Sequence, residues 1–207
     1  MSQIDLFSTG APTSLDDLIA RMMKMTDDPL ANAGTNVVIS RGNPDAKLLI
    51  VGEAPGPQEN IQGKPFVGRA GQLLDKILES ANFDPEKDVF ITNSVFRMPP
   101  GEDGKAFRKP TDKEIEYYRP YVREIIRFVD PLIMLLTGNV ASQSILGKTG
   151  ITTLRGKWTQ QDGRWIMPIF HPSYLLRNPD RSPGSPKALM WDDIRRVREK
   201  YDELIGK

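Results

Sequence analysis

Four short apolar runs constrain the possible folds of this chain more than any other feature. They lie at residues 47–52, 88–93, 132–137 and 165–170. None shows the strict alternation of a strand with one face in water, so each suits a strand buried on both faces. Helical patterns lie between and after these runs, and such alternation is typical of parallel sheets. We therefore predict an α/β fold, a three-layer sandwich whose central four-stranded, mainly parallel sheet is flanked by helices.

Caps, loops and breakers give the remaining elements. Helices are predicted at residues 15–25, 70–82, 111–128, 139–146 and 187–205. Ser14 with Asp17, and Thr111 with Glu114, have the spacing of helix caps. Connecting segments are predicted at residues 31–43, 53–68 and 97–110, and Pro168 indicates an edge or a bulge in the last strand. The 207 residues suit a single domain, residues 1–207, of which residues 1–13 are expected to be flexible.

Composition excludes several classes of function. The 28 Lys and Arg residues nearly balance the 27 Asp and Glu residues, so any contact with DNA must be a local patch. No stretch has the length of a membrane span and residues 1–14 do not read as a secretory signal, so we expect a cytoplasmic protein with no membrane contact. The absence of cysteine excludes disulfides, thiolate zinc sites and cysteine nucleophiles, and the single histidine, His171, excludes a multi-histidine metal site.

Polar segments directly follow three of the apolar runs. They are Gly52-Glu-Ala-Pro-Gly56, Asn93 and His171-Pro-Ser-Tyr-Leu-Leu-Arg177. The carboxyl ends of parallel strands meet at one edge of a sheet, where ligands bind, so we expect the three segments to converge. Taken singly, each has a plainer interpretation: a tight turn, a cap and a structural histidine.

Together with their neighbours, these segments resemble family 4 uracil-DNA glycosylases. The other matching motifs, in the family's order, are Gly63-Lys-Pro-Phe-Val-Gly68, Ala70-Gly71, Ile91-Thr-Asn93, Pro99-Pro-Gly101 and Arg119-Pro-Tyr121. The similarity runs from about residue 25 to residue 204. It implies an enzyme of base excision repair that flips uracil out of DNA and hydrolyses its N-glycosidic bond, leaving an abasic site. The implied partner is uracil-containing DNA, bound by a monomer.

The resemblance assigns the base pocket to three side chains whose chemistry suits uracil. Phe66 would stack on the extruded base, although a core position is the plainer alternative. The Asn93 amide offers a donor and an acceptor for uracil O4 and N3, and cytosine presents the opposite pattern. His171 would donate a hydrogen bond to O2 as negative charge develops there, and the alternative is a histidine that only caps the strand.

Two acids and two small residues complete the implied pocket. Glu53 is a candidate to hold the attacking water or to oppose the positive charge of the sugar. Glu59 is implied as a gate beside C5 of the base that excludes the methyl group of thymine, and solvated surface is the plainer alternative for both acids. Gly52 and Ala54 belong to the same substrate-binding motif, and Ala54 stands where the related family 1 enzymes place an aspartate.

DNA contacts are assigned to residues around this pocket. They are Ser173, Gly138, Asn139, Arg155, Leu175, Leu176 and Arg177. The serine and the helix start at Gly138-Asn139 offer donors to phosphate, and Arg155 offers a cation. Residues 175–177 resemble the family's intercalation loop, in which an apolar wedge fills the gap left by the flipped base. The alternative that the two leucines cover the core is expected to hold for one of them.

The family usually binds a four-iron four-sulfur cluster through four cysteines. The flanking motifs align those positions with Met25, Asp28, Arg97 and Tyr118, none of which is a thiolate. We therefore predict a protein without iron and without any other metal or cofactor. Ordinary packing of the first helix is expected to replace the tie that the cluster makes between the N-terminal segment and the loop at 97–110.

Three other functions compete with this interpretation. A catalytically inactive DNA-binding or replication accessory protein on the same fold is the main alternative, because fold does not fix function. A relative that traps its product covalently is disfavoured, since it needs a further histidine in a basic loop and the only one is His171. A nucleotide-phosphate binder ranks last, because no glycine-rich phosphate loop with its Lys and Ser/Thr is present.

Overall fold

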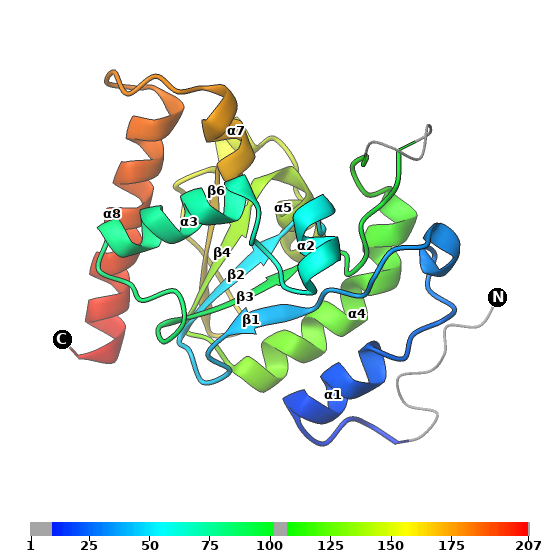
Figure 1. The fold of residues 1–207 in the computed structure, drawn as a ribbon. Helices are drawn as coiled ribbons and strands as arrows, with labels where there is room; N and C mark the ends of the chain where they lie inside the picture. Colours follow the sequence, from blue (N-terminus) through cyan, green and yellow to red (C-terminus); the bar gives the residue numbers. More distant parts are fainter. Residues whose placement is uncertain (1–9, 102–106, 207) are drawn as a thin grey trace.

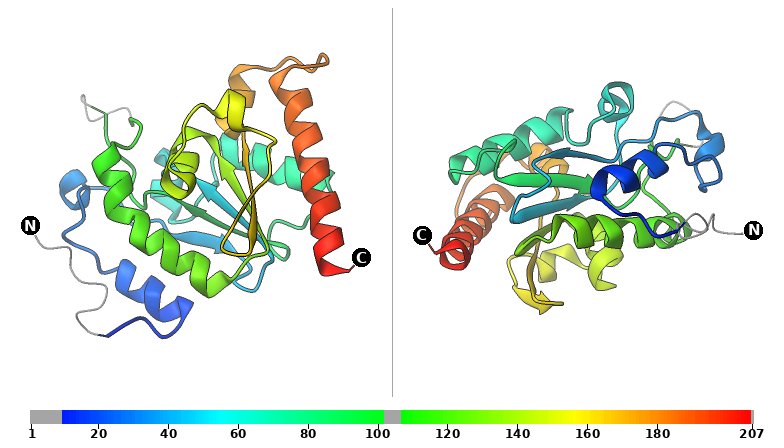
Figure 2. Two further views of the ribbon diagram at one scale, coloured as in Figure 1. Left: turned by 180° about the vertical axis from the view of Figure 1, so that it is seen from behind. Right: turned by 90° about the horizontal axis from the view of Figure 1, so that it is seen from below.

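The computed structural model describes residues 10–101 and 107–206. The flexibility expected for residues 1–13 therefore falls mostly outside the described residues, and so does the middle of the loop expected at 97–110. Within the described part a single six-stranded sheet has the order β1-β3-β2-β4-β6-β5, with helices on both of its faces (Figures 1 and 2). The predicted α/β sandwich is confirmed.

The four apolar runs form the centre of the sheet. They are β2 (Leu48–Gly52), β3 (Val89–Asn93), β4 (Ile133–Thr137) and β6 (Arg164–Ile169), and each pairs with its neighbour in parallel. Two short strands were not predicted, so the expected number of four is wrong. β1 (Ser40–Gly42) and β5 (Thr159–Gln161) add antiparallel edges. Three-residue strands of polar sequence have no periodicity to read, and only pairing reveals them.

Alternate residues of the central strands feed two separate cores. Leu49 and Val51 face a layer built by α1 (Leu15–Met22), α4 (Asp112–Val129) and α5 (Gly138–Leu146). Leu48 and Ile50 face the layer of α3 (Arg69–Ser80), α7 (Pro172–Arg177) and α8 (Pro186–Ile205). Burial on both faces explains why the strands lack a polar alternation.

Several short elements escaped the sequence analysis. They are the helices η1 (Ala31–Ala33), α2 (Pro57–Gln62) and α6 (Ile151–Leu154), and α7 itself, which was interpreted only as a polar segment. The cap signals were accurate: the Ser14 hydroxyl accepts from the Asp17 amide at 3.1 Å, and Thr111 and Glu114 cap each other reciprocally. The first helix nevertheless ends at Met22 rather than Met25. No helix in the described ranges has the length and apolar character needed to cross a membrane.

Pro168 occupies a position where a strand tolerates proline. β6 is not an edge strand, but its pairing with β5 ends at Ile166. On the β5 side the carbonyl of Pro168 accepts instead from the amide of Gly156 at 2.9 Å. The missing amide hydrogen of Pro168 therefore costs no strand pairing, since no strand lies on that side.

The N-terminal segment is tied to the loop that follows β3 by a buried polar network. The carboxylate of Asp28, whose side chain is 0% exposed, accepts from Arg97 Nε at 2.9 Å and from the Tyr118 hydroxyl. Arg97 also donates to the carbonyls of Met25, at 2.8 Å, and Thr35. The expectation that ordinary packing of the first helix makes this tie is therefore incomplete, because a charged group and its partners carry much of it. Sequence alone did not reveal that Asp28 and Arg97 pair.

Candidate active site

The carboxyl ends of the parallel strands open into a cleft of about 880 Å³. Its walls come from the segment after β2, the turn before α3, the end of β3, the loop before α4, and the starts of α5 and α7. The predicted site residues that line it are Glu53, Ala54, Glu59, Phe66, Asn93, Gly138, Asn139, His171, Ser173, Leu176 and Arg177. The expected convergence of the three polar segments is thus what the structure has.

Phe66 and Asn93 meet at Gly52, the last residue of β2. A methyl group on Gly52 would overlap the side-chain oxygen of Asn93 and lie 2.5 Å from the Phe66 ring, so only glycine fits there. Asn93 is 1% exposed and lines the cleft, with its side-chain oxygen beside Gly52. A side-chain amide offers both a donor and an acceptor, so this group can bind a polar ligand that enters the cleft.

The Phe66 ring is presented by a backbone in an unusual conformation. Its φ of 55° lies in the left-handed region, which is costly for an aromatic residue unless the surroundings enforce it. Glu59 enforces it from one side, because its carboxylate accepts from the amides of Val67 at 2.9 Å, Gly68 at 2.7 Å and Gly56 at 3.1 Å. The carboxylate proposed as a gate beside the base is therefore also the group that holds the turn.

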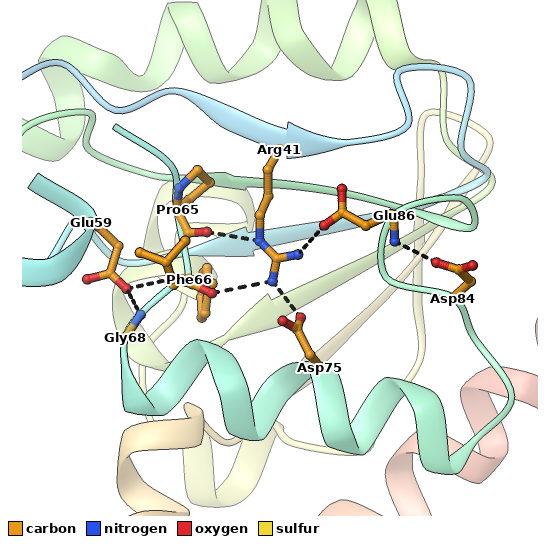
Figure 3. A network of polar contacts seen from close by, with 9 residues as sticks. Arg41, Glu59, Pro65, Phe66, Gly68, Asp75, Asp84 and Glu86 are labelled. Atoms are coloured by element: carbon orange, nitrogen blue, oxygen red, sulfur yellow. Dashed lines mark hydrogen bonds and ion pairs between the residues drawn. The ribbon is translucent and has the colours of Figure 1, made fainter. Parts of the chain in front are cut away.

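Arg41 holds the same turn from the other side, as Figure 3 shows. Its Nε donates to the carbonyl of Pro65 at 3.0 Å and its Nη2 to the carbonyl of Phe66 at 3.4 Å. Asp75 at 2.5 Å and Glu86 at 3.2 Å pair with the guanidinium, whose side chain is 7% exposed. Sequence reasoning missed this residue, since Arg41 lies on the short edge strand β1 and has no motif around it.

His171 caps the N-terminus of α7. Its Nδ1 accepts from the Ser173 amide at 3.2 Å and lies 2.8 Å from the Ser173 hydroxyl. In the neutral ring the hydrogen therefore sits on Nε2, which leaves that nitrogen as the donor for a ligand. The ring lies 5.9 Å from the Phe66 ring, centroid to centroid. Gly138 allows the approach, because a methyl group there would lie 3.2 Å from His171 Cβ.

Burial shifts the pKa values of both candidate catalytic groups toward their neutral forms. It lowers the pKa of His171 to about 4, and the positive charges of Arg177 and Lys109 add to this. The imidazole is accordingly neutral at pH 7. Burial also raises the pKa of Glu53, against the opposing effect of Lys109 and Arg177. Both shifts report a site that is poorly solvated, where hydrogen bonds to developing charge are strong.

Three predicted DNA contacts have other partners in this structure. The guanidinium of Arg155 is paired with the buried carboxylate of Asp193 and does not line the cleft, so its assignment as a phosphate contact is corrected. Leu175 is 1% exposed and belongs to the core, whereas Leu176 is 37% exposed on the cleft wall. The Asn139 side-chain oxygen accepts from two amides of the α6 turn at 2.8 and 2.9 Å, which leaves its Nδ2 group and its backbone amide as donors to phosphate.

The positions that the family uses for its cluster offer no suitable ligands for iron in the described part of the chain. The four positions that the family gives to cysteines hold Met25, Asp28, Arg97 and Tyr118, and a guanidinium ion paired with the single carboxylate repels a cation. Within residues 10–101 and 107–206, no group of three histidine, cysteine, aspartate or glutamate side chains is placed to bind a metal. The residues present therefore do not fit a cluster.

Comparison with known proteins agrees with this geometry. The family model of the uracil DNA glycosylase superfamily matches residues 39–195. A type-4 uracil-DNA glycosylase of Thermotoga maritima is 38% identical over 183 residues, which cover 86% of this chain and 90% of that protein. Another, of Archaeoglobus fulgidus, is 35% identical over 204 residues, 94% of each. A DNA polymerase of Bacillus phage SP01 is 33% identical over 152 residues, which are 73% of this chain and 16% of the polymerase.

Proposed function

Since this chain belongs to the uracil DNA glycosylase superfamily, we propose that it is a uracil-DNA glycosylase that removes uracil from DNA and leaves an abasic site. The observation that carries the proposal is the convergence of Phe66, Asn93 and His171 on one cleft at the carboxyl edge of the sheet. A flat ring, a side-chain amide and a neutral imidazole are together what recognition of an extruded uracil requires.

Recognition of the base falls to Phe66 and Asn93. The ring stacks on the face of uracil, and the Asn93 amide pairs with O4 and N3, so that cytosine meets a donor where it needs an acceptor. Glu59 excludes thymine at C5 in this proposal, a role compatible with its hydrogen bonds to the turn. Ala54 lines the cleft with no atom beyond Cβ, and Gly52 leaves room for the Asn93 amide and the Phe66 ring that contact the base.

Bond cleavage depends on the stability of the departing uracil anion. As the bond from C1′ to N1 breaks, negative charge spreads to O2, where the Nε2 hydrogen of His171 stabilises it without being transferred. Water adds to C1′ and loses a proton, and Glu53 is proposed to orient that water and receive the proton. The uracil anion is finally protonated by solvent, and Glu53 returns its proton to solvent, which completes the hydrolysis.

DNA contacts are proposed for the rim of the cleft. The backbone at the start of α5, Gly138 and Asn139, faces phosphate and Arg177 supplies positive charge, while the Ser173 hydroxyl lies at the same rim and donates to His171 Nδ1. Leu176 is the wedge that fills the gap left by uracil. Leu175 and Arg155 support this rim from within the core.

An assay on an oligonucleotide with a single uracil tests the proposal. Release of uracil, seen as strand cleavage after alkali, should fall roughly a hundredfold or more in His171→Ala, as for the loss of one donor to developing charge. Asn178→Ala serves as a control at the opposite, C-terminal end of α7, outside the cleft. No uracil release by the wild-type protein would reject the proposal.

The match inside a phage DNA polymerase favours one second candidate, a non-catalytic accessory module of replication. Such a module binds DNA and releases no base. The same oligonucleotide discriminates, because binding without cleavage supports the accessory role and cleavage that depends on His171 excludes it.

We further propose that the protein contains no iron. The support is the sequence, which lacks thiolates, and the ion pair at the cluster positions. Iron analysis and visible absorbance of the purified chain test this, and bound iron would contradict it. The monomeric state and the cytoplasmic location expected from the sequence stay predictions, the first of which gel filtration measures.

A further inference from the structure

An exposed aromatic side chain lies on the wall of the cleft outside the family's pocket motifs. Phe107 is 57% exposed and lines the cleft together with the base-pocket residues. A large apolar side chain that is exposed to solvent beside a binding site indicates a contact with the ligand or a partner. Neither the core nor the pocket chemistry explains it.

The backbone beside Phe107 is held firmly, so the ring is presented at a defined place. Phe107 pairs with Pro100 in an isolated β-bridge, and the Arg108 amide donates to the carbonyl of Pro99 at 3.0 Å. The Arg108 guanidinium binds the buried carboxylate of Glu114 at 2.7 and 2.8 Å. Glu114 also accepts from the Thr111 amide at the N-terminal cap of α4. Burial alone would raise the pKa of Glu114, but the hydrogen bonds from Arg108 and Thr111 outweigh it and lower that pKa.

Positive charge accompanies the ring. Lys109 is exposed on the same wall. Its positive charge acts inside the cleft, where it contributes to the lowered pKa of His171 and opposes the rise that burial causes in the pKa of Glu53. Leu176 and Arg177 repeat the combination of an apolar tip and a cation on α7. Residues 107–111 before α4 lie apart from α7 in Figure 1 and in the left view of Figure 2, and both segments line the cleft, which therefore has two such arms.

Resting on the proposed function, we propose that Phe107 and Lys109 form a second DNA-binding arm, in which the ring stacks on an unpaired base beside the extruded uracil and the lysine contacts phosphate. Aromatic rings flanked by cations are the usual means of holding single-stranded nucleic acid, since every base has a face on which a ring can stack. The preferred substrate is therefore uracil in single-stranded or locally unpaired DNA.

Binding without turnover tests the arm. The probe is a fluorescein-labelled single strand with one 2′-fluoro-2′-deoxyuridine, whose fluorine slows glycosidic cleavage, and the readout is Kd by anisotropy. Phe107→Ala should raise Kd about 5- to 150-fold, the range for loss of one stacked base. Phe107→Tyr should stay within about threefold of wild type, because its ring still stacks. Lys109→Gln should reduce the slope of log Kd against log salt by about one phosphate contact.

A matched control removes another exposed aromatic. Trp191 on α8 is 43% exposed and lies outside the cleft, so Trp191→Ala should leave Kd unchanged. The arm is refuted if Phe107→Ala binds within twofold of wild type, or if it weakens duplex and single strand equally, since paired bases offer no free face. These outcomes are distinct from those that test the glycosylase proposal. The protein can release uracil even if Phe107 is not needed for binding, and Kd can depend on Phe107 even if no uracil is released.

Discussion

Removal of Arg97 is the sharpest test of how the N-terminal segment is held. Arg97→Met takes away the cation beside the fully buried Asp28 carboxylate and two hydrogen bonds to backbone carbonyls. Breaking a buried ion pair by deleting one partner costs about 3–5 kcal/mol, because the remaining charge stays buried without its partner. In a chain of this size each kcal/mol lowers Tm by about 2–4 °C, so we expect a loss of about 6–20 °C.

Thermal unfolding followed by circular dichroism measures this loss. Arg195→Met is the matched control, because it breaks an exposed ion pair with Asp192, in which both side chains are more than half exposed, and such pairs contribute less than about 1 kcal/mol. The double variant Asp28→Leu, Arg97→Met should recover most of the stability, since apolar replacement of a buried pair is often neutral. If Arg97→Met lowers Tm no more than Arg195→Met does, the network is not the tie that we describe.

Three further predictions concern the pocket. Arg41→Met should lower kcat/KM for uracil release about tenfold or more through misplacement of the Phe66 ring, with partial rescue in Arg41→Lys, and steady-state kinetics of the folded variants measure it. Gly52→Ala should abolish uracil release even where Tm falls only slightly, because the added methyl group would occupy the space of the Asn93 oxygen and the Phe66 ring. Full activity would contradict the geometry. The pKa of His171 is lowered from 6.5 to about 4, so the unfolded chain binds the proton first and the free energy of unfolding falls between pH 6.5 and 4, by about 3 kcal/mol. Urea midpoints should fall more steeply with decreasing pH in wild type than in His171→Gln, whose remaining dependence comes from carboxyl groups with lowered pKa values, such as Glu114.

The sequence was most informative where a pattern has only one structural solution. Continuous apolar runs on short segments indicated β2, β3, β4 and β6, and the residues after them, Glu53 and His171 among them, line one cleft. A parallel sheet leaves no other place for strand ends to meet. Even the doubt about the two leucines was justified, since one is buried and one exposed.

Long-range polar pairing was the part that the sequence could not supply. Arg41 and the carbonyl of Phe66 are separated by 25 residues, and Arg97 and Asp28 by 69. Neither arginine differs in local sequence from one that is solvated. Arg155 misled in the opposite direction, because it was assigned to phosphate as a cation, whereas its guanidinium pairs with Asp193 on α8. Such pairs depend on which helices pack together, and periodicity does not encode that.

The residues that replace the cluster cysteines and the residues that position Phe107 hold different ends of one loop. Their effects on stability and on DNA binding can therefore be separated. Arg97 anchors the loop after β3 to Asp28 at its start, and Arg108 anchors it to Glu114 at its end. Among the described residues, the side chains of these two anchors make their hydrogen bonds to groups other than Asn93 and His171. Loss of the first anchor should therefore lower stability while the base pocket keeps its geometry. Loss of the second should release Phe107 and weaken DNA binding, so Arg108→Met, assayed for Kd and kcat with single-stranded substrate, should raise Kd and leave kcat at saturation nearly unchanged. A fall in kcat with unchanged Kd would show that the loop acts on the chemistry instead.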